Sequence, residues 1–337
     1  MPEKHYRVGI IGCGGMARAH ANAYRDLPQT RLVAGADISE AALQRFGEEY
    51  EVTALYTDYH EMLGKETLDI VDVCTWPRLH PEPTIAVAEA GVKGIICEKP
   101  MALSLAEADA MIAAADKSGT KLAIGHQLRC WGRVTRAREI IAAGEIGEPY
   151  HFHGICDGGD LLSNATHTVD LLRLLANDAP IEWVIGQIDA GRKNQRYAHY
   201  VEDFAIGYWQ HRGGARGFIE VGTYSSKGYH HIYVDGTEGR LELGAPGGPG
   251  LRVRGKGEGA WRVPEFQDGN PSTNAAQELV RAIEENREHI SSGRQGRATH
   301  ELLLAIFESA SQRGIVHLPL RAQDFVLERM IERGEIL

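Results

Sequence analysis

The first 37 residues contain the pattern that most restricts the fold of this chain. A short apolar run at residues 6–11 precedes a Gly-Cys-Gly-Gly-Met-Ala turn at residues 12–17 and an alanine-rich stretch of helical character. Strand, glycine turn and helix in this order are typical of a dinucleotide site. Gly12 permits the tight turn, Gly14 lets backbone N–H groups approach a pyrophosphate, and Ala17 allows close packing of helix on strand. The helix N-terminus adds partial positive charge.

A single glycine turn is weak evidence, but a second strand strengthens it. Residues 31–36 form an apolar run that ends at Asp37. A carboxylate at this spacing can accept hydrogen bonds from an adenosine ribose, and it repels a 2′-phosphate. The pattern therefore favours NAD over NADP. The alternative is that Asp37, with Ser39 beside it, caps a helix.

Strand and helix continue to alternate as far as residue 124. Apolar runs at residues 68–74, 93–97 and 122–124 are separated by helical stretches, one of which opens with a capping box of Ser104 and Glu107. This alternation predicts a doubly wound parallel sheet, a Rossmann fold, over residues 1–124. Its ligand should lie along the carboxyl ends of the strands, where Thr75 and Lys99 also fall.

Residues 125–337 predict a different architecture. A helical segment at residues 133–143 and an alternating strand at residues 150–156 are followed by a series of strands from residue 181 onward. Turn-separated strands of this kind indicate a large, mostly antiparallel open sheet flanked by helices, an α+β domain. The Gly/Pro-rich stretch 244–259 reads as a surface loop, and His230 and His231 as a strand edge rather than part of a site.

A metal site is one interpretation of the strand at residues 150–156. His151 and His153 share a strand face, and Cys156 and Asp157 follow closely. The spacing is loose, and two histidines on one strand face are more often hydrogen-bonded or exposed. We expect no metal.

Charge and composition restrict the partners. The formal net charge of -10 argues against nucleic acid and anionic membranes, which are held by clustered Lys and Arg. No apolar run approaches the roughly 20 residues of a membrane span, and the N-terminus lacks the pattern of a signal peptide. Five cysteines without a CxxC pair indicate a reduced, cytoplasmic protein.

Several motifs together resemble one family, the Gfo/Idh/MocA oxidoreductases, over nearly the whole chain. The residues that carry the resemblance are the glycine turn, the spacing from Thr75 to His80, Glu98-Lys99-Pro100, and residues 125–129 after the last strand. Glu98-Lys99-Pro100 is the most specific of them. The bland alternative for this tripeptide is a strand end with a solvated Glu-Lys pair.

The resemblance implies a site. The residues expected to bind NAD are Gly12, Cys13, Gly14, Gly15, Met16, Ala17, Asp37, Ile38, Thr75, Trp76, His80, Glu98, Lys99 and Gln127. Those expected to bind a polyhydroxylated substrate are Lys99, His126, Arg129, Asp160, Ser163, Asn164 and His167. Lys99 and His167 are the expected catalytic residues. Asp170 matches an acid one helical turn beyond the histidine. The alternatives are a cap role for Arg129, and a helix start capped by Ser163, Asn164 or Thr166 with an incidental His167.

Two positions depart from the family pattern. Trp76-Pro77 stands where many members have Pro-Asn, and Ser163 stands where an aspartate usually lies four residues before the histidine. Serine cannot supply the negative charge that would stabilise a protonated imidazole. Asp160 is close enough in sequence to be considered as a substitute.

The expected activity is hydride transfer between nicotinamide and a hydroxyl or keto carbon of a sugar, cyclitol or sugar derivative. Lys99 would exchange the hydroxyl proton, which for a lysine near neutrality requires burial or nearby positive charge such as oxidised nicotinamide. Two alternatives stay open: an NAD-retaining glycosidase or lyase that oxidises a hydroxyl transiently, and a non-catalytic dinucleotide or sugar sensor. By resemblance, the open sheet should mediate a homodimer or homotetramer.

Overall fold

The computed structural model describes residues 5–222, 229–245, 247–321 and 323–335. Residues 1–4, used above in the signal-peptide expectation, lie outside the described residues, as does residue 246 of the expected loop. The chain forms two compact units. The first contains residues up to 130 together with 269–297, and the second contains 131–268 together with the chain from 298 onward. The sequence predicted one division of the chain, after residue 124, and so did not predict that residues 269–297 belong to the first unit.

The first unit is built on a six-stranded parallel sheet, which confirms the doubly wound fold. Its strands lie in the order β3-β2-β1-β4-β5-β6, so the order reverses between β1 and β4. Ligands of such sheets bind beyond the carboxyl ends of the strands at this reversal. The strands are β1 (Tyr6–Ile11), β2 (Thr30–Ala36), β3 (Ala54–Tyr56), β4 (Ile70–Val73), β5 (Gly94–Cys97) and β6 (Lys121–Ile124).

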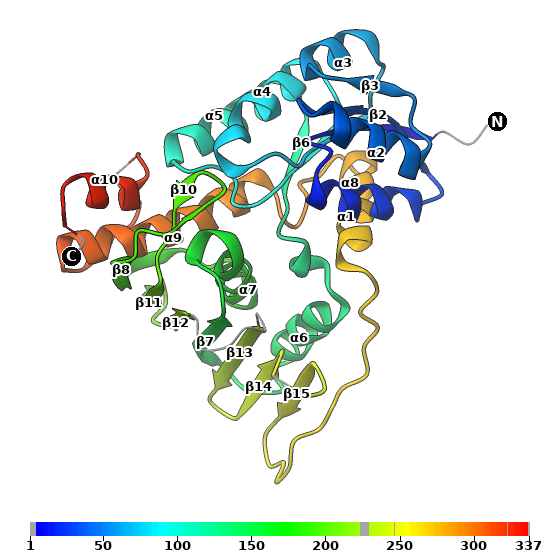
Figure 1. Ribbon diagram of the computed structural model, residues 1–337. Helices are drawn as coiled ribbons and strands as arrows, with labels where there is room; N and C mark the ends of the chain where they lie inside the picture. The colour runs from blue at the N-terminus through cyan, green and yellow to red at the C-terminus, as the bar shows by residue number, and fades with distance from the viewer. Residues whose placement is uncertain (1–4, 223–228, 246, 322, 336–337) are drawn as a thin grey trace. The chain divides into compact units, whose positions relative to one another are not determined.

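Helices cover both faces of this sheet. They are α1 (Gly15–Arg25), α2 (Glu40–Tyr50), α3 (Tyr59–Lys65), α4 (Pro81–Glu89), α5 (Leu105–Ser118) and α8 (Pro271–Glu284), with short helical turns η1 (Pro77–Leu79) and η2 (Gln127–Cys130). The predicted capping box is present at the start of α5. Helix α8 lies beside α1 (Figure 1), and its Leu279 shares a core cluster with Tyr6, Val8 and Ile70.

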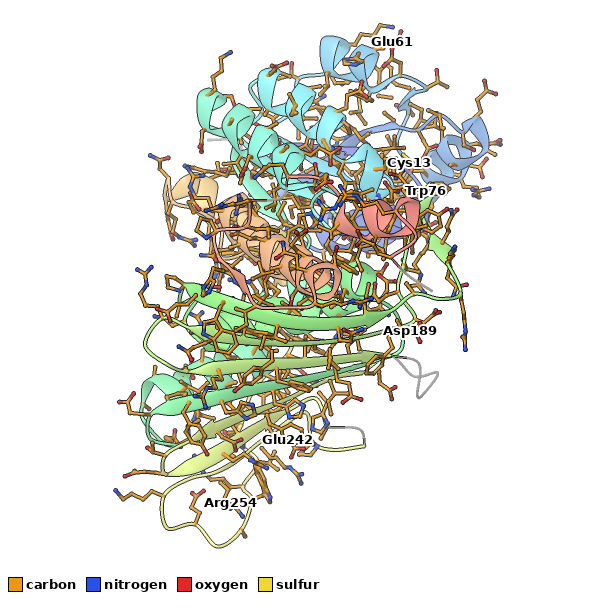
Figure 2. The ribbon with its side chains drawn as sticks, turned by 90° about the vertical axis from the view of Figure 1, so that its left-hand side faces the viewer. Cys13, Glu61, Trp76, Asp189, Glu242 and Arg254 are labelled. Carbon is orange, nitrogen blue, oxygen red and sulfur yellow. The ribbon has the colours of Figure 1, made fainter. Side chains whose placement is uncertain are left out.

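The second unit contains an eight-stranded mixed sheet, in agreement with the expected α+β domain. The strand order is β15-β14-β13-β7-β12-β11-β8-β16, and only the β7–β12 pair is parallel within the described residues. The strands are β7 (Pro149–Asp157), β8 (Ile181–Asp189), β11 (Phe204–His211), β12 (Arg216–Gly222), β13 (Tyr229–Gly236), β14 (Gly239–Leu243), β15 (Leu251–Arg254) and β16 (Val316–His317). Strand β15 lies within the stretch that the sequence predicted as a loop, and it pairs with β14, where Figure 2 marks Glu242 and Arg254.

The remaining elements of the second unit surround this sheet. They are α6 (Gly132–Ala142), a π-helical turn η3 (Leu161–Ala165), α7 (Thr166–Leu175), the small ladder of β9 (Gln195–Arg196) and β10 (His199–Tyr200), and α10 (Val326–Glu332). Helix α9 (Gly293–Gln312) begins in the first unit and ends in the second. No helix of the described residues is long and apolar enough to cross a membrane.

Helix α7 is buried on every side, although half of its ten residues are polar. Its close approach to the sheet depends on Gly154 of β7, where an added Cβ would lie 2.6 Å from Thr168 Cγ2 and 2.9 Å from Leu172 Cδ1. The polar residues are paired inside the unit: Thr299 Oγ1 donates to Asp170 Oδ1 (2.8 Å) and accepts from Arg173 Nη1 (2.9 Å). This packing fixes the position of His167 in the first turn of α7.

Candidate active site

The predicted cofactor residues lie in the loops and first helical turns that follow the strands of the first unit's sheet. The glycine turn follows β1, Asp37 and Ile38 follow β2, and Thr75 begins the loop after β4. Glu98 and Lys99 follow β5. Because these strands are parallel and adjacent, their carboxyl ends meet at one edge of the sheet. Figure 2 marks Cys13 and Trp76 in two of the loops.

Gly12 has the backbone conformation that the turn requires. Its φ is +89°, which favours glycine, and an added Cβ would lie 2.8 Å from the backbone of Cys74 and Thr75. Gly14 and Gly15, in contrast, have nothing within 4 Å of an added Cβ. The turn is therefore closed toward β4 and open at the start of α1, which has no side-chain cap.

Asp37 is held in place by the glycine turn itself. Cys13 N donates to its Oδ2 and Ser39 N to its Oδ1, both at 2.8 Å. Ser39, not Asp37, caps α2 by accepting from Ala42 N, so the helix-cap alternative for Asp37 is wrong. Each carboxylate oxygen retains a second lone pair for a ligand hydroxyl.

Further observations show that this edge fits a nucleotide. Thr75 Oγ1 and Gln127 Oε1 are buried atoms with no hydrogen-bond partner among the described residues. Large apolar side chains are also exposed in the loops here: Met16 (41%), Ile38 (91%) and Trp76 (56%). Apolar surface beside a few convergent polar groups is typical of a ligand site. The residues present therefore fit the NAD that the sequence predicts.

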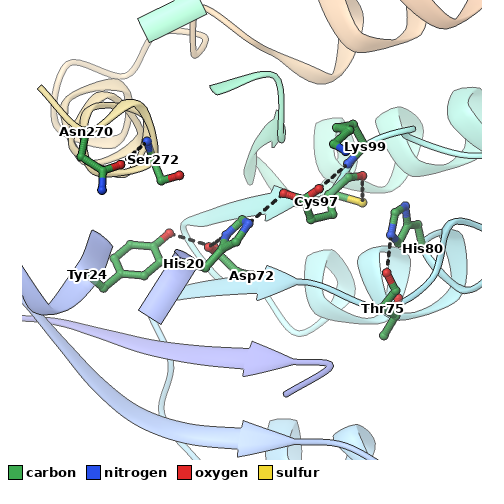
Figure 3. A network of polar contacts seen from close by, with 10 residues as sticks. His20, Tyr24, Asp72, Thr75, His80, Cys97, Lys99, Asn270 and Ser272 are labelled. Carbon is green, nitrogen blue, oxygen red and sulfur yellow. Dashed lines mark hydrogen bonds and ion pairs between the residues drawn. The ribbon is translucent and has the colours of Figure 1, made fainter. Parts of the chain in front are cut away.

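A buried polar cluster lies beneath Lys99 (Figure 3). His20 of α1 contacts Asp72 Oδ2 through Nδ1 (2.6 Å) and Glu98 Oε1 through Nε2 (2.9 Å). Tyr24 donates to Asp72 Oδ1 (2.8 Å), and Lys99 N donates to Glu98 Oε2 (3.2 Å). A buried carboxylate in the central strand β4 is costly unless it is paired in this way. The cluster ties α1 and β4 to the backbone of Lys99.

The cluster holds opposite charges. Burial alone would raise the pKa of Glu98, but the hydrogen bond to His20 and the charges of His20 and Lys99 lower that pKa to about 2. Burial opposes the charged form of His20, yet Cys74, Asp72 and Glu98 together raise its pKa well above the ordinary value. His20 is thus an imidazolium between two carboxylates. The Glu-Lys pair is not solvated, because Glu98 is 4% exposed.

His80 joins two of the edge loops. Its Nε2 lies 2.9 Å from Thr75 O and its Nδ1 lies 2.8 Å from Pro100 O. Burial lowers the pKa of His80. A neutral ring donates through only one nitrogen, so only one of these carbonyls is satisfied at a time. His80 supports the loops that carry Thr75 and Lys99.

Two of the predicted substrate residues after β6, Arg129 and His126, are buried and contact the segment before α9. Arg129 is 1% exposed and its Nη1 donates to Ile290 O (3.2 Å), a contact that anchors η2 and is not a helix cap. His126 is likewise buried, and its carbonyl accepts from Ser291 Oγ (3.2 Å). Gln127 keeps the unpartnered Oε1.

In the second unit, four predicted site residues lie at one helix start. Asp160 accepts from Ser163 N (2.7 Å) and caps η3, which leads directly into α7. The alternative in which Ser163, Asn164 or Thr166 caps the helix is wrong, because the π-helical turn η3 precedes α7 and the residue before α7 is Ala165, which gives no side-chain cap. Asn164 Nδ2 donates to Gly158 O (3.2 Å).

Sequence reasoning missed one neighbour of His167. The His230 ring lies 5.6 Å from the His167 ring, edge-on, and its Nδ1 lies 2.9 Å from Thr168 Oγ1. His231 points to the other face of β13 and contacts Glu242 Oε1 (2.7 Å). Strand β13 pairs with β14 and β7, so the expected strand-edge position of the two histidines is wrong. Because successive side chains of a strand point to opposite faces, the strand pattern was the signal that only one of the two histidines faces α7.

The histidines of β7 lie among other side chains of the sheet. His153 packs against Phe218, with ring centroids 4.8 Å apart, and burial together with His151 and His231 lowers its pKa. Among the described residues, no group of three or more His, Cys, Asp or Glu side chains is placed to hold a metal ion. None of the five cysteines forms a disulfide bond.

Two family models match this chain. Residues 6–126 match "Oxidoreductase family, NAD-binding Rossmann fold", and residues 134–242 match "GFO/IDH/MocA C-terminal domain".

Named relatives agree with these models. The chain is 29% identical to D-apiose dehydrogenase of Paraburkholderia graminis, covering 72% of this chain and 68% of the relative. It is 30% identical to 1,5-anhydro-D-fructose reductase of Ensifer adhaerens, covering 70% of this chain and 74% of the relative. The WlbA dehydrogenase of Bordetella pertussis, solved with NADH and UDP-GlcNAcA, has the same fold, with a TM-score of 0.79 at 24% identity over 94% of this chain and 100% of that one.

Proposed function

Because this chain belongs to the Gfo/Idh/MocA family of NAD-binding oxidoreductases, we propose that it transfers a hydride between NAD and a hydroxyl or keto carbon of a sugar, cyclitol or sugar derivative. The observation that carries this proposal is the meeting of the open glycine turn, Asp37, Thr75 and the anchored Lys99 at one edge of the sheet. The substrate class is supported by relatives named as dehydrogenases or reductases of apiose and anhydrofructose.

We propose that NAD is held by residues of the first unit. The backbone of residues 12–17 would bind the pyrophosphate, and Asp37 the adenosine ribose, with Ile38 against the base. Thr75, Trp76, His80, Glu98 and Gln127 would surround the nicotinamide half. When bound, NAD supplies the hydride acceptor or donor.

Lys99 is our proposed proton acceptor or donor at the reacting hydroxyl. Its backbone is fixed by Glu98, and Glu98 is fixed by His20. We propose that His167 shares the proton or positions a neighbouring hydroxyl. Asp160, Ser163, Asn164, His126 and Arg129 stay proposed substrate residues, although the contacts of Asp160, Asn164 and Arg129 described above are with backbone groups of their own unit.

A polyol and glycoside screen that follows the absorbance of reduced nicotinamide, with NAD and NADP in parallel, tests the activity. Net NADH formation is expected. Aglycone release without net NADH would instead support the redox-neutral glycosidase, and tight NAD binding without any turnover would support the sensor.

Lys99→Met tests the assignment of the proton. We expect kcat to fall by about 10²–10⁴-fold, the usual contribution of a positioned acid or base, while NAD still binds. Wild-type turnover in this variant would show that Lys99 does not exchange the proton.

The open face of the second unit's sheet supports the proposed self-association. One cross-strand row runs over five adjacent strands and consists of Ile185, Tyr208, Phe218, His153 and Tyr233. The opposite face is filled by α7 and by Ile306 of α9. A half-exposed aromatic row of this kind is typical of an interface, and we propose a homodimer or homotetramer through it. Five cysteines without a disulfide bond support our proposal of a cytoplasmic location, which cell fractionation would test.

A further inference from the structure

Two carboxyl groups from separate parts of the second unit are buried at the turn that precedes α7. Asp160 follows β7, and Glu202 lies just before β11. Their exposures are 2% and 4%. Buried acidic side chains require partners, so the contacts of this pair indicate what the pair does.

Both carboxyls hold the same turn. Glu202 Oε1 accepts from Leu161 N, and Asp160 Oδ1 accepts from Ser163 N (2.7 Å). The Asp160 carbonyl also accepts from Ala165 N (3.0 Å). The turn continues without a break into α7, where His167 is the second residue. The two acids therefore determine where α7 begins.

The pair is arranged to hold one proton. Arg196 Nη1 lies 3.7 Å from Asp160 Oδ2. Burial first, and then the charge of Asp160, raise the pKa of Glu202 to about 8, even though the hydrogen bond from Leu161 N acts in the opposite direction. The two carboxyls meet at one place in the chain, because they accept from the backbone N–H groups of Leu161 and Ser163, two residues apart. Asp160 Oδ2 is a buried acceptor with no hydrogen-bond partner among the described residues.

The other charged groups near the pair are mostly acidic. Asp203 also acts to raise the pKa of Glu202. At the end of β7, burial first, and then the charges of Asp160, Asp157 and Glu202, raise the pKa of the Cys156 thiol to about 12. Arg196, half exposed, is the cation recorded against Asp160. A second negative charge on the pair would therefore be repelled from several directions.

We propose that Glu202 and Asp160 form a one-proton carboxyl pair that positions the turn before α7, and with it His167. Glu202 is a positioning residue and does not exchange a proton with substrate. When Glu202 ionises, repulsion between the two carboxylates loosens the turn. The activity readout of this proposal rests on the proposed dehydrogenase function, but its structural readout does not.

Glu202→Gln is the decisive variant. Glutamine keeps an oxygen for Leu161 N, offers N–H donors toward Asp160 and cannot ionise. In the wild type, we expect the hydrogen-exchange protection of residues 158–170, corrected for intrinsic rates, to fall above about pH 8, and kcat to fall with it. In Glu202→Gln both should persist at higher pH, with kcat at pH 7 within about twofold of wild type and KM for NAD unchanged.

Two further variants complete the test. Glu202→Ala removes the acceptor for Leu161 N, so it should lose protection of this turn and kcat already at pH 7. Asp203→Asn is the matched control, because Asp203 is adjacent in sequence and pairs with Asn194 Nδ2 (2.7 Å) instead of the turn. It should keep wild-type protection and kcat at pH 7, and loss of the Asp203 charge should only move the fall in protection to a slightly lower pH.

The results separate the two proposals. The proposal of a positioning pair is overturned if hydrogen-exchange protection in Glu202→Gln falls with pH as it does in the wild type. It is also overturned if Glu202→Gln loses kcat at pH 7 while its protection is normal. If no substrate is turned over by the wild type, the proposed function fails, and the exchange measurement still decides whether the pair exists.

Discussion

At the scale of single residues, the buried imidazolium His20 is the most sensitive position of the first unit. His20→Leu leaves Asp72 and Glu98 as buried carboxylates without their shared cation, which should lower the free energy of unfolding by about 3–5 kcal/mol. Urea denaturation measures this loss. His60→Leu, at an exposed histidine of α3, is the control and should change stability by about 0.5 kcal/mol or less.

The same cluster predicts a pH window of stability. The folded pKa of Glu98, about 2, lies below the ~4.3 of unfolded glutamate, so its contribution is present above about pH 4.3 and is lost as pH falls toward 2. The folded pKa of His20 lies above the ~6.5 of unfolded histidine, so its contribution is complete below about pH 6.5 and is lost as pH rises through the folded pKa. We expect the difference in Tm between wild type and His20→Leu to be largest between these limits. A difference that does not vary with pH would contradict this.

Asp37 should determine which dinucleotide is used. Asp37→Ser removes the charged acceptor for a ribose hydroxyl and the partner of Cys13 N, so KM for NAD should rise about 10- to 100-fold, the range for hydrogen bonds to a charged group. Steady-state kinetics with NAD and NADP should also show weaker discrimination against NADP. Glu40→Gln, an exposed acid three residues on, should leave both constants unchanged; equal effects in the two variants would point to general charge and not to a ribose contact.

At the scale of elements, the contact of α7 with β7 should tolerate no added atom. Gly154→Ala places a Cβ against Thr168 and Leu172, an overpacking that costs about 1–3 kcal/mol and shifts the helix that carries His167. Thermal unfolding should show the loss, and kcat should fall more than the affinity for NAD. Gly64→Ala in α3, where nothing lies within 4 Å of the new Cβ, should instead be neutral or stabilising.

Local sequence patterns predicted the elements that local chemistry determines. The glycine turn, Asp37 at the end of β2 and the Ser104 capping box depend on residues close in sequence, and all are present. His20, Asp72 and Glu202 were missed because a polar residue in a helix, strand or loop looks exposed until its distant partner is known. The π-helical turn was missed because the segment before α7 contains several residues that commonly cap helices. The sequence alone does not show that Asp160 is the one that caps this turn.

At the scale of the whole molecule, the aromatic row on the open sheet determines the expected assembly. Phe218→Glu places a charge at the centre of that row, so light scattering coupled to gel filtration should show a shift from dimer or tetramer toward monomer. Arg216→Glu, at an exposed position two residues away on the same strand, is the control. An unchanged mass for Phe218→Glu would exclude this face as the interface.

The first unit should not fold from the N-terminal segment alone. A fragment of residues 1–130 lacks α8, whose Leu279 and Val280 pack with Tyr6 and Val8 in one core cluster. We expect this fragment to unfold without cooperativity by circular dichroism, and the same fragment joined through a short linker to residues 269–297 to regain a cooperative transition. Cooperative unfolding of residues 1–130 alone would show that α8 is dispensable.

The return of residues 269–297 also limits how genes for such chains can recombine. A single crossover near residue 130 gives a hybrid whose parallel sheet comes from one parent and whose covering helix α8 comes from the other. At the low identities of these relatives, Leu279 and its neighbours would then face an unmatched core. Exchange of the whole second unit therefore requires three crossovers, one at each end of residues 131–268 and a third after residue 297.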